Sequence, residues 1–414
     1  MSTVLEVLPI TEMFEPSNCD DLCALITSAH DSETAIYPLG GETALNFGLP
    51  AKHSGWGVSL KQFDQVIDYP ARDMTITVEA GVSMQSLAET LAKENQRLPI
   101  DVPQASEATL GGVIATNFNG PRRYGMGTVR DYVIGIHAVD GTGRAFKGGG
   151  RVVKNVAGYD FCKLLTGSLG TLAVIHQVTL KVKPCPQRSA IVVGTVKNLA
   201  QAENVLAELV TSATTPAAIE LLCGPVWHDD AIWDGDAADE LAIAVGLEGT
   251  DAEVQWMCAQ LLGDLETWGV ENCREVEQGK VADAWTSMSE FPAQHQSPLV
   301  LKGSVVPGAT TKLIEAILGV DPNCSIQAHA GNGIVIASFS EFPVDGLSRT
   351  LLAKLHPVAN SAQGNIVVLS NPGGHEMTHQ SVWGGIHAPF GLMTDVKKRF
   401  DPQGILNPGR FVYV

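Results

Sequence analysis

Glycine is concentrated in the first half of this chain, and this limits what the chain can fold into. Of the 414 residues 42 are Gly, about 10% against an average of about 7%. The excess lies mainly between Gly111 and Gly170. Glycine tolerates positive φ angles and lets backbone N–H groups approach a ligand closely. The stretch therefore favours tight turns and a ligand-lining backbone.

Charge excludes several classes of partner. Lys plus Arg total 27 and Asp plus Glu total 45, which gives 27 − 45 = −18. A chain with this much negative charge repels nucleic-acid phosphates and anionic lipids. We therefore expect neither a nucleic acid nor a membrane surface as a partner. The N-terminal sequence MSTVLEVLPITEMFEPS has no basic region or long apolar stretch, and no run of about 18 apolar residues follows. We therefore expect no secretory signal and no membrane span.

The eight cysteines show no metal-type spacing. They are scattered, and even the closest two, Cys19 and Cys23, do not form a Cys-x-x-Cys pair. Zinc and iron–sulfur sites need closer groupings of ligands. Reduced thiols in a cytoplasmic protein are the expectation.

The first half is predicted to alternate short strands with glycine turns. A capped helix is predicted over 18–29, strands over 34–39 and 73–80, and an amphipathic helix over 83–97. Further on, β-branched runs predict strands over 132–139 and 171–183, with Asp140-Gly141 in a hairpin turn.

The pattern changes after Lys183-Pro184-Cys185-Pro186, where we place the main domain boundary. Predicted strands over 189–196 and 240–247 then alternate with predicted helices over 199–212 and 251–266. This alternation favours an α+β domain with an antiparallel or mixed sheet. The end of the chain predicts a helix over 390–400, a turn and an extended tail.

Two segments suit a backbone lining for a flat polar cofactor. In Pro38–Thr43 (PLGGET) a strand meets two glycines and a hydroxyl, which can wrap a diphosphate, although an ordinary turn explains Gly-Gly as well. In 108–125, small residues alternate with Thr109, Thr116 and Asn117. Neither a P-loop nor a Gly-x-Gly-x-x-Gly that opens a helix is present, which excludes those nucleotide-binding modes.

A third segment completes the set. It comprises 151–161 (RVVKNVAGYDF) and 166–175 (TGSLGTLAVI), in which a glycine turn feeds a strand. In this order and spacing, the three segments resemble the FAD-binding domain of the vanillyl-alcohol oxidase family, also called the PCMH-type domain. The resemblance covers about residues 30–184, and the tail over 400–409 (FDPQGILNPG) resembles the family's terminal segment. Residues 151–174 and His329–Gly333 resemble the branch formed by the E subunits of bacterial glycolate oxidases.

The resemblance implies an α+β fold class with three parts. These are a two-subdomain PCMH-type FAD-binding domain over 1–184, an α+β cap domain with an antiparallel sheet over 185–388, and a C-terminal segment over 389–414 that returns to the FAD domain. The implied cofactor is FAD. The residues implied to contact it are Gly40, Gly41, Glu42, Thr43, Pro103, Thr109, Gly111, Gly112, Thr116, Asn117, Arg123, Tyr124, Gly125, Gly170, Thr171, Val174 and Asn407.

The sequence also departs from the family. Glu42 replaces a small residue, Leu169 stands where Glu is common, and no His follows the first loop, so we expect FAD not to be attached there covalently. The related branch often carries a His–Ala–Gly–Asp–Gly–Asn–x–His metal motif. His329-Ala330-Gly331-Asn332-Gly333 keeps the first His and lacks the second, so no metal site is expected.

The implied activity is oxidation of glycolate, a small 2-hydroxy acid, to glyoxylate by an FAD-binding subunit of a glycolate oxidase complex. The implied partners are a paralogous flavoprotein subunit and an iron–sulfur subunit, in the cytoplasm or at the inner membrane through those partners. The alternative is a flavin-binding electron-transfer or structural subunit with no turnover of its own. A third hypothesis is an interaction subunit that binds no flavin.

No catalytic residue is assigned from the sequence. Arg122 and Arg123 are candidate cations for a substrate carboxylate, although a structural ion pair explains either one better. His375, His379 and His387 cluster near the C-terminal turn, and solvated or capping histidines explain them better than catalysis does.

Overall fold

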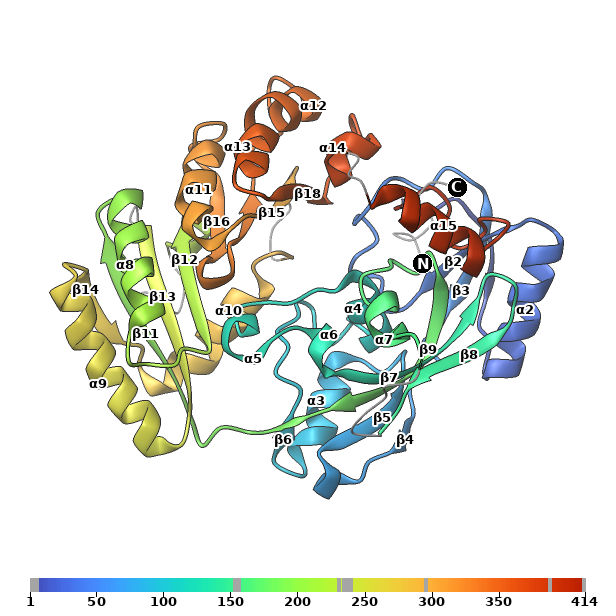
Figure 1. Cartoon of the computed structure of the whole chain (residues 1–414), viewed down its shortest axis with the longest axis horizontal. Helices are drawn as coiled ribbons and strands as arrows, with labels where there is room; N and C mark the ends of the chain where they lie inside the picture. The colour runs from blue at the N-terminus through green and yellow to red at the C-terminus, as the bar shows by residue number, and fades with distance from the viewer. Residues whose placement is uncertain are drawn as a thin grey trace. The chain divides into compact units, whose positions relative to one another are not determined.

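A computed structural model describes residues 7–151, 158–228, 232, 241–293, 297–385 and 389–411. The chain forms two compact units. Unit 1 combines residues 1–119, 128–185 and 385–414, and unit 2 combines residues 120–127 and 186–384. Figure 1 shows the elements of each unit.

Unit 1 contains a small parallel sheet. Its strand order is β1-β3-β2, formed by β1 (Ile10–Phe14), β3 (Gly55–Ser59) and β2 (Ala35–Leu39). The tail adds a parallel bridge from Leu406 to Ile36 beside β2. Helix α2 (Cys19–Asp31) begins at Asn18, whose side chain accepts a hydrogen bond from the Asp21 N–H, and buries Leu22 and Ile26 in the core beside this sheet.

A five-stranded antiparallel sheet forms the rest of unit 1, in the order β4-β5-β9-β7-β8. Its strands are β4 (Val66–Asp68), β5 (Thr75–Glu79), β9 (Ala173–Lys181), β7 (Val133–Asp140) and β8 (Ala145–Gly149). A two-stranded ribbon joins β6 (Gln96–Arg97) to β10 (Lys183–Pro184). The helices of this part are α3 (Met84–Ala92), α4 (Leu110–Thr116), α6 (Val129–Tyr132) and α7 (Phe161–Leu165).

A buried ion pair holds the C-terminal tail in unit 1. Helix α15 (Phe390–Phe400) places Lys397 beside Asp401, and Lys397 Nζ also donates to the carbonyls of Thr171 (2.7 Å) and Leu406 (3.0 Å). Asp401 in turn accepts hydrogen bonds from the backbone N–H groups of Ile405 and Leu406. Because both charges are buried and fully bonded, the tail position is strongly specified.

Unit 2 is built on an eight-stranded antiparallel sheet in the order β14-β11-β13-β12-β16-β17-β15-β18. Its strands are β11 (Arg188–Val196), β12 (Ala218–Cys223), β13 (Leu241–Gly249), β14 (Glu271–Glu275), β15 (Val300–Ser304), β16 (Ser325–His329), β17 (Ile334–Ser338) and β18 (Asn365–Ser370).

Helices pack on both faces of this sheet. On one face lie α8 (Leu199–Thr211), α9 (Asp251–Thr267), α11 (Thr310–Leu318) and α13 (His356–Ser361) (Figure 1). On the other face α10 (Val281–Glu290) contributes Trp285 and Met288 to an apolar core. The short helices are α5 (Arg123–Met126), α12 (Leu347–Arg349) and α14 (His379–Trp383), and Thr350–Leu355 form a π-helix.

The predicted fold class is confirmed, because unit 2 is α+β with an antiparallel sheet and unit 1 combines two sheets with helices. The predicted helix over 390–400 has those bounds, and the Asp140-Gly141 turn joins β7 to β8. The predicted helix over 83–97 ends at Ala92 instead. Asn95 then takes a positive φ of 53°, and Gln96–Arg97 pair with β10.

One segment does not belong to the unit that its place in the sequence suggests. Residues 120–127 precede the predicted boundary at 184, yet they pack with unit 2. The assignment of 1–184, 185–388 and 389–414 to an FAD domain, a cap and a returning segment stays a prediction. Among the residues with described structure, no helix is long and apolar enough to cross a membrane.

Candidate functional site

The predicted first loop packs tightly against the segment before α4. A Cβ at Gly40 would lie 2.1 Å from Thr109 Oγ1, and one at Gly41 would lie 1.7 Å from the Glu107 carbonyl oxygen. Both positions therefore require glycine for packing. Glu42 takes a positive φ of 65°, and its carboxylate pairs with Lys61 at 3.1 Å. That ion pair offsets the charge of the Glu42 carboxylate, whose position beside a diphosphate stays a prediction.

The predicted second segment forms α4 and contains an open backbone position. Thr109 caps the helix, and its Oγ1 accepts from the Gly112 N–H at 3.4 Å, which is long for such a bond. Gly111 is in close contact with Ala80, whereas Gly112 is exposed and a Cβ there would meet only Thr109 Oγ1, at 3.3 Å. Gly112 therefore offers a face of backbone that a ligand can approach.

Thr116 and Asn117, later in this segment, stabilise or end helix α4. The Thr116 hydroxyl donates to the Gly112 carbonyl at 2.9 Å, and Asn117 ends α4 with a φ of 52°. Pro103 is half-buried in the preceding loop, and Thr43 is exposed.

The third segment joins the end of α4 and the C-terminal tail. The N–H groups of Gly167 and Leu169 donate to the carbonyls of Ile114 (2.9 Å) and Ala115 (2.8 Å). Asn407 Nδ2 donates to the Leu169 carbonyl at 2.8 Å, and Gly170 has a φ of 64°. Thr171 and Val174 are buried. Loops over 40–43, 109–117, 167–171 and 407 therefore meet in unit 1.

Part of the predicted third segment lies elsewhere. Residues 152–157 are outside the described residues. Arg151 Nη1 pairs with Asp68 at 2.5 Å, and Tyr159 is 85% exposed. The partly exposed ion pair and the exposed Tyr159 ring are typical of a surface segment.

Arg123, Tyr124 and Gly125 lie in α5 and contact unit 2. The Tyr124 ring covers Gly331, where a Cβ would come within 2.4 Å of the ring. The Gly125 N–H donates to the Ala217 carbonyl at 3.0 Å, which leaves no room for a side chain beside Pro216. Protein packing therefore accounts for both glycines, and flavin contact by this trio stays a prediction.

Arg122 has a structural role. Its Nε lies 2.8 Å from Glu248 Oε1, whose side chain is 1% exposed, and its guanidinium stacks 3.6 Å above the Trp285 ring. A buried carboxylate and an aromatic face are strong partners for arginine. Arg122 therefore forms a structural ion pair, although its partner is a buried carboxylate and not the phosphate or surface carboxylate that the sequence suggested.

A cluster of buried polar groups that the sequence did not predict lies in unit 2. Glu220 on β12 faces His329 on β16, and His329 Nδ1 lies 2.9 Å from each carboxylate oxygen. Gln327 Nε2 donates to the same carboxylate at 3.0 Å. Glu220 interrupts the apolar run AIELLC, and that lone acid was the available signal.

Lys302 on β15 is a further buried cation. Burial and the nearby Arg123 guanidinium lower the pKa of Lys302 to about 8. Across the part of the chain that the structure describes, Lys302 forms no ion pair. The lone lysine in the apolar strand sequence VLKGS was the available sequence signal.

The predicted histidine cluster does not form one helix face. His379 begins α14, while His375 lies before it in a turn and its ring contacts Phe342. Burial lowers the pKa of His379. His387 lies outside the described residues.

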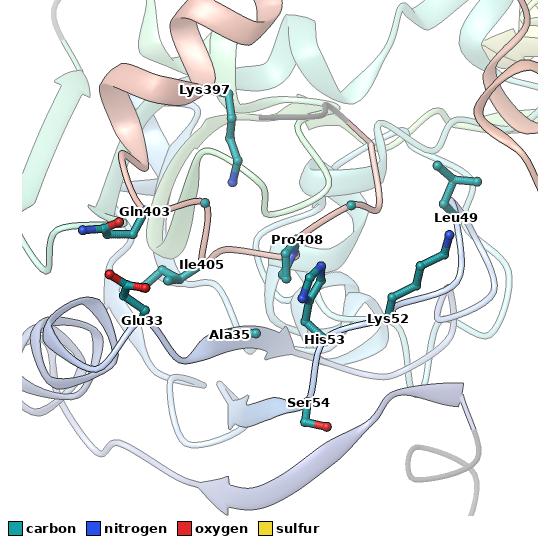
Figure 2. Close-up of a pocket in the computed structure, with 12 residues that line it drawn as sticks. Glu33, Ala35, Leu49, Lys52, His53, Ser54, Lys397, Gln403, Ile405 and Pro408 are labelled. Atoms are coloured by element: carbon teal, nitrogen blue, oxygen red, sulfur yellow. The ribbon is translucent and has the colours of Figure 1, made fainter.

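Unit 1 also has a cavity of about 600 Å³ between the start of β2 and the C-terminal tail. Figure 2 shows Lys52, His53, Gln403 and Lys397 around it. The Lys397 amine is already bonded to protein groups. None of the residues predicted to contact FAD lines this cavity, so it is distinct from the loops described above.

Two cysteines and a histidine lie close together in unit 1. Cys19 Sγ lies 3.6 Å from His176 Nε2 and 4.0 Å from Cys23 Sγ, and burial raises the pKa of Cys23 to about 11. No group of three or more His, Cys, Asp or Glu side chains suited to a metal occurs in the described ranges.

Comparison with known proteins identifies the cofactor. Residues 11–149 match the family model described as an FAD binding domain, and residues 387–411 match that of the C-terminal domain of FAD-linked oxidases. The chain contains a PCMH-type FAD-binding domain, and its cofactor is FAD. The predicted family resemblance is confirmed.

Relatives of this FAD-binding chain extend over nearly its whole length. Glycolate oxidase subunit GlcE of Escherichia coli is 26% identical over 95% of this chain and 97% of its own. A D-lactate dehydrogenase of Archaeoglobus fulgidus is 26% identical over 96% of this chain and 90% of its own. A solved alkyldihydroxyacetonephosphate synthase shares the fold, with a TM-score of 0.67, 17% identity and coverage of 96% of this chain and 76% of its own. The chain is therefore similar to FAD-linked oxidoreductases that include hydroxy-acid dehydrogenases.

The loops of unit 1 fit FAD. The exposed backbone at Gly112 is free of side chain on the side that a diphosphate would approach, and the Gly40-Gly41 loop packs beside it. Positive φ angles at Asn117, Gly170 and Asn407 shape the neighbouring turns. Backbone-lined concavities of this kind bind phosphate without a lysine.

Proposed function

We propose that this chain is an FAD-binding subunit of a glycolate oxidase and that it oxidises glycolate, or a close 2-hydroxy acid, to the 2-oxo acid. The observation that carries the proposal is the buried Lys302 ammonium, which has the Arg123 guanidinium nearby and no ion pair among the described residues, in unit 2 of a chain that contains an FAD-binding domain. The two hydroxy-acid relatives support the same reaction class.

Lys302 meets the first chemical need of such a substrate. The chain carries a net charge of −18, so an anionic substrate needs a local cation. A desolvated ammonium next to a second cation gains free energy when a carboxylate binds, because the anion offsets both charges. At pH 7 Lys302 is mainly protonated, since its lowered pKa is still about 8.

FAD, when bound, accepts two electrons and the α-hydrogen from the substrate. We propose that the loop residues Gly40–Thr43, the α4 residues Thr109–Asn117 and the turn residues Gly170 and Asn407 hold it. The protein then contributes binding, orientation and exclusion of water rather than redox chemistry.

We further propose that the chain works in a cytoplasmic complex with a paralogous flavoprotein subunit and an iron–sulfur subunit. The name of the Escherichia coli relative describes that protein as a subunit, which supports a complex. The thiols of this chain, all free in the structure, form no cluster-type group in the described ranges. Electrons would then leave through a partner.

The test uses the FAD-loaded full chain, alone and with co-purified partners. Glycolate and D-lactate are added anaerobically, and flavin bleaching is followed by absorbance. Bleaching of the isolated chain at a rate that supports turnover is the expected result. Bleaching only in the complex would favour the electron-transfer alternative, and a colourless protein would favour the flavin-free hypothesis.

A further inference from the structure

Helix α2 of unit 1 (Figure 1) presents two thiols on one face. Cys19 is the first residue of the helix and Cys23 lies four residues later, a spacing that places both side chains on the same side. Their Sγ atoms are 4.0 Å apart. Both residues are half-buried against the core of unit 1, so each keeps some surface in contact with solvent. These two residues form the α2 thiol pair.

A histidine on β9 lies beside the first thiol. His176 Nε2 is 3.6 Å from Cys19 Sγ, a distance at which a thiol donates a hydrogen bond. Burial and the neighbouring His137 lower the pKa of His176 to about 4, so its ring is neutral at pH 7. A thiol that faces Nε2 favours the tautomer in which Nδ1 carries the hydrogen and Nε2 keeps its lone pair. His176 Nε2 is therefore an acceptor for the Cys19 proton.

The two thiols of the pair differ in their surroundings. Burial and the adjacent Cys19 and Asp20 raise the pKa of Cys23 to about 11, so Cys23 stays a thiol at pH 7. The nucleophile in sulfur oxidation is the thiolate. Cys19 has two features common to reactive cysteines, which are a place in the first turn of a helix and an imidazole next to the sulfur. Cys19 is therefore assigned as the attacking sulfur and Cys23 as the second to react.

A disulfide between these residues requires only a local change of the helix. A rise of about 1.5 Å per residue puts Cα atoms four residues apart at about 6 Å, within the range of about 4.4–6.8 Å found in disulfides. The Cβ atoms of such a pair are about 5–6 Å apart and must approach to about 4.5 Å. Because Cys19 is the terminal residue of α2, this movement involves the first turn and the Asn18 cap.

Other cysteines are poorer candidates for oxidation. Burial raises the pKa of Cys162, Cys258 and Cys273 to about 11. Burial also raises the pKa of Cys223 and Cys324. Such thiols are almost entirely protonated at pH 7 and react slowly. The structure therefore favours oxidation at the α2 thiol pair over these five sites.

We propose that Cys19 and Cys23 form a reversible disulfide when the protein meets hydrogen peroxide, with His176 as the acceptor of the Cys19 proton. The Cys19 sulfur attacks one peroxide oxygen, the O–O bond breaks, and Cys19 becomes a sulfenic acid. The thiol proton passes through His176 Nε2 to the leaving hydroxide, which becomes water. Cys23 then attacks the sulfenic sulfur, an S–S bond forms, and a second hydroxide leaves with the Cys23 proton as water. The two thiols lose two electrons, and one peroxide gains them.

The test uses the FAD-loaded full chain, purified with a reductant and then treated with hydrogen peroxide. Cys19 and Cys23 are the two cysteines of the tryptic peptide that ends at Lys52, so mass spectrometry detects a disulfide within it directly. We expect this peptide to lose two hydrogen atoms, to resist alkylation, and to recover both thiols with dithiothreitol. The other cysteines should stay open to alkylation after unfolding.

Variants separate the roles of the three residues. Cys23→Ser should stop at the sulfenic acid of Cys19, which dimedone traps, and Cys19→Ser should take up no dimedone. His176→Asn should slow the oxidation by about 2- to 10-fold, the size expected for one hydrogen bond, and give the same product. Cys185→Ser is the matched control, because Cys185 is another half-buried thiol of unit 1. It should leave the rate and the product unchanged.

Three outcomes overturn the inference. The first is a peptide that keeps both thiols at peroxide concentrations that oxidise Cys185. The second is a wild-type chain in which oxidation stops at Cys19. The third is zinc or copper bound stoichiometrically to the wild type and lost in Cys19→Ser, which would make the pair a metal site. If Cys19→Ser does not fold, the peptide mass of the wild type and the dimedone adduct of Cys23→Ser decide.

This inference is independent of the proposed function. The oxidation of the α2 thiol pair needs hydrogen peroxide and no 2-hydroxy acid. A chain that no 2-hydroxy acid reduces, alone or in complex, therefore overturns the proposed function and leaves the disulfide in place.

Discussion

Replacement of Gly112 by Val tests the assignment of the FAD loops. Gly112 is exposed in α4, has no positive φ, and a Cβ there would meet only Thr109 Oγ1 at 3.3 Å. A Cβ at this position therefore needs only a small shift of the Thr109 hydroxyl. Valine also has the better helix propensity, so the free energy of unfolding should change by only about 0.5 kcal/mol.

The effect on FAD should be much larger. The valine side chain occupies the open face that a diphosphate would approach, and a lost hydrogen bond to a charged group is worth about 1.5–3 kcal/mol. At about 1.4 kcal/mol per factor of ten, FAD binding should weaken by about 10- to 100-fold. The ratio of absorbance at 450 nm to that at 280 nm after gel filtration, and FAD titration of the apoprotein, measure this.

Two further variants make the result specific. Gly263→Val is the control, because Gly263 is an exposed glycine of α9 with nothing within 4 Å of its Cβ position. It should keep both FAD and stability. Gly41→Ala should instead destabilise the chain, since its Cβ would lie 1.7 Å from the Glu107 carbonyl oxygen. Full FAD content in folded Gly112→Val would refute the placement of FAD beside α4.

Three further outcomes are expected. Lys302→Met should raise the KM for glycolate by about 10- to 100-fold. The wild-type protein should bind the carboxylate below pH 8 and lose affinity above it, because the Lys302 ammonium, with its pKa of about 8, loses its proton there. Binding that does not depend on pH would contradict this role. Lys397→Met leaves Asp401 as a buried charge without its ion-pair partner. Urea titrations should show a free energy of unfolding lower by about 3–5 kcal/mol. A loss below about 1 kcal/mol would argue that this ion pair does not hold the C-terminal tail. Burial and the adjacent His137 lower the pKa of His176 to about 4. As the pH falls from 6.5 towards 4, this histidine is protonated in the unfolded chain but not in the folded one, so the free energy of unfolding should decrease. His176→Asn should weaken this dependence on pH, and an unchanged dependence would show that other groups cause it.

The sequence by itself determined the cofactor domain. The order and spacing of Gly40-Gly41, Gly111-Gly112 and Gly170 can be read from the sequence, although the close contacts of Gly40, Gly41 and Gly111 are with Thr109, Glu107 and Ala80, far from them in the chain. The same holds for capped helices such as α2, whose Asn18 cap and first-turn acids are contiguous in the chain. Period and capping therefore predicted helices such as α2, α8, α9 and α15 and strands such as β7 and β11, whereas β12, β14 to β18, α10 and α11 were not predicted.

Tertiary structure alone decided the polar cluster of unit 2. Glu220 and His329 are 109 residues apart in the chain, and only the β12–β16 register sets them face to face. The partner of Arg122, Glu248, is 126 residues away. Single charges inside apolar strands carry no periodic signal, so their partners follow from strand order, which the sequence pattern does not determine. For this chain, local sequence patterns predict the loops that we propose hold FAD, and the pairing of distant strands decided which buried polar side chains face one another.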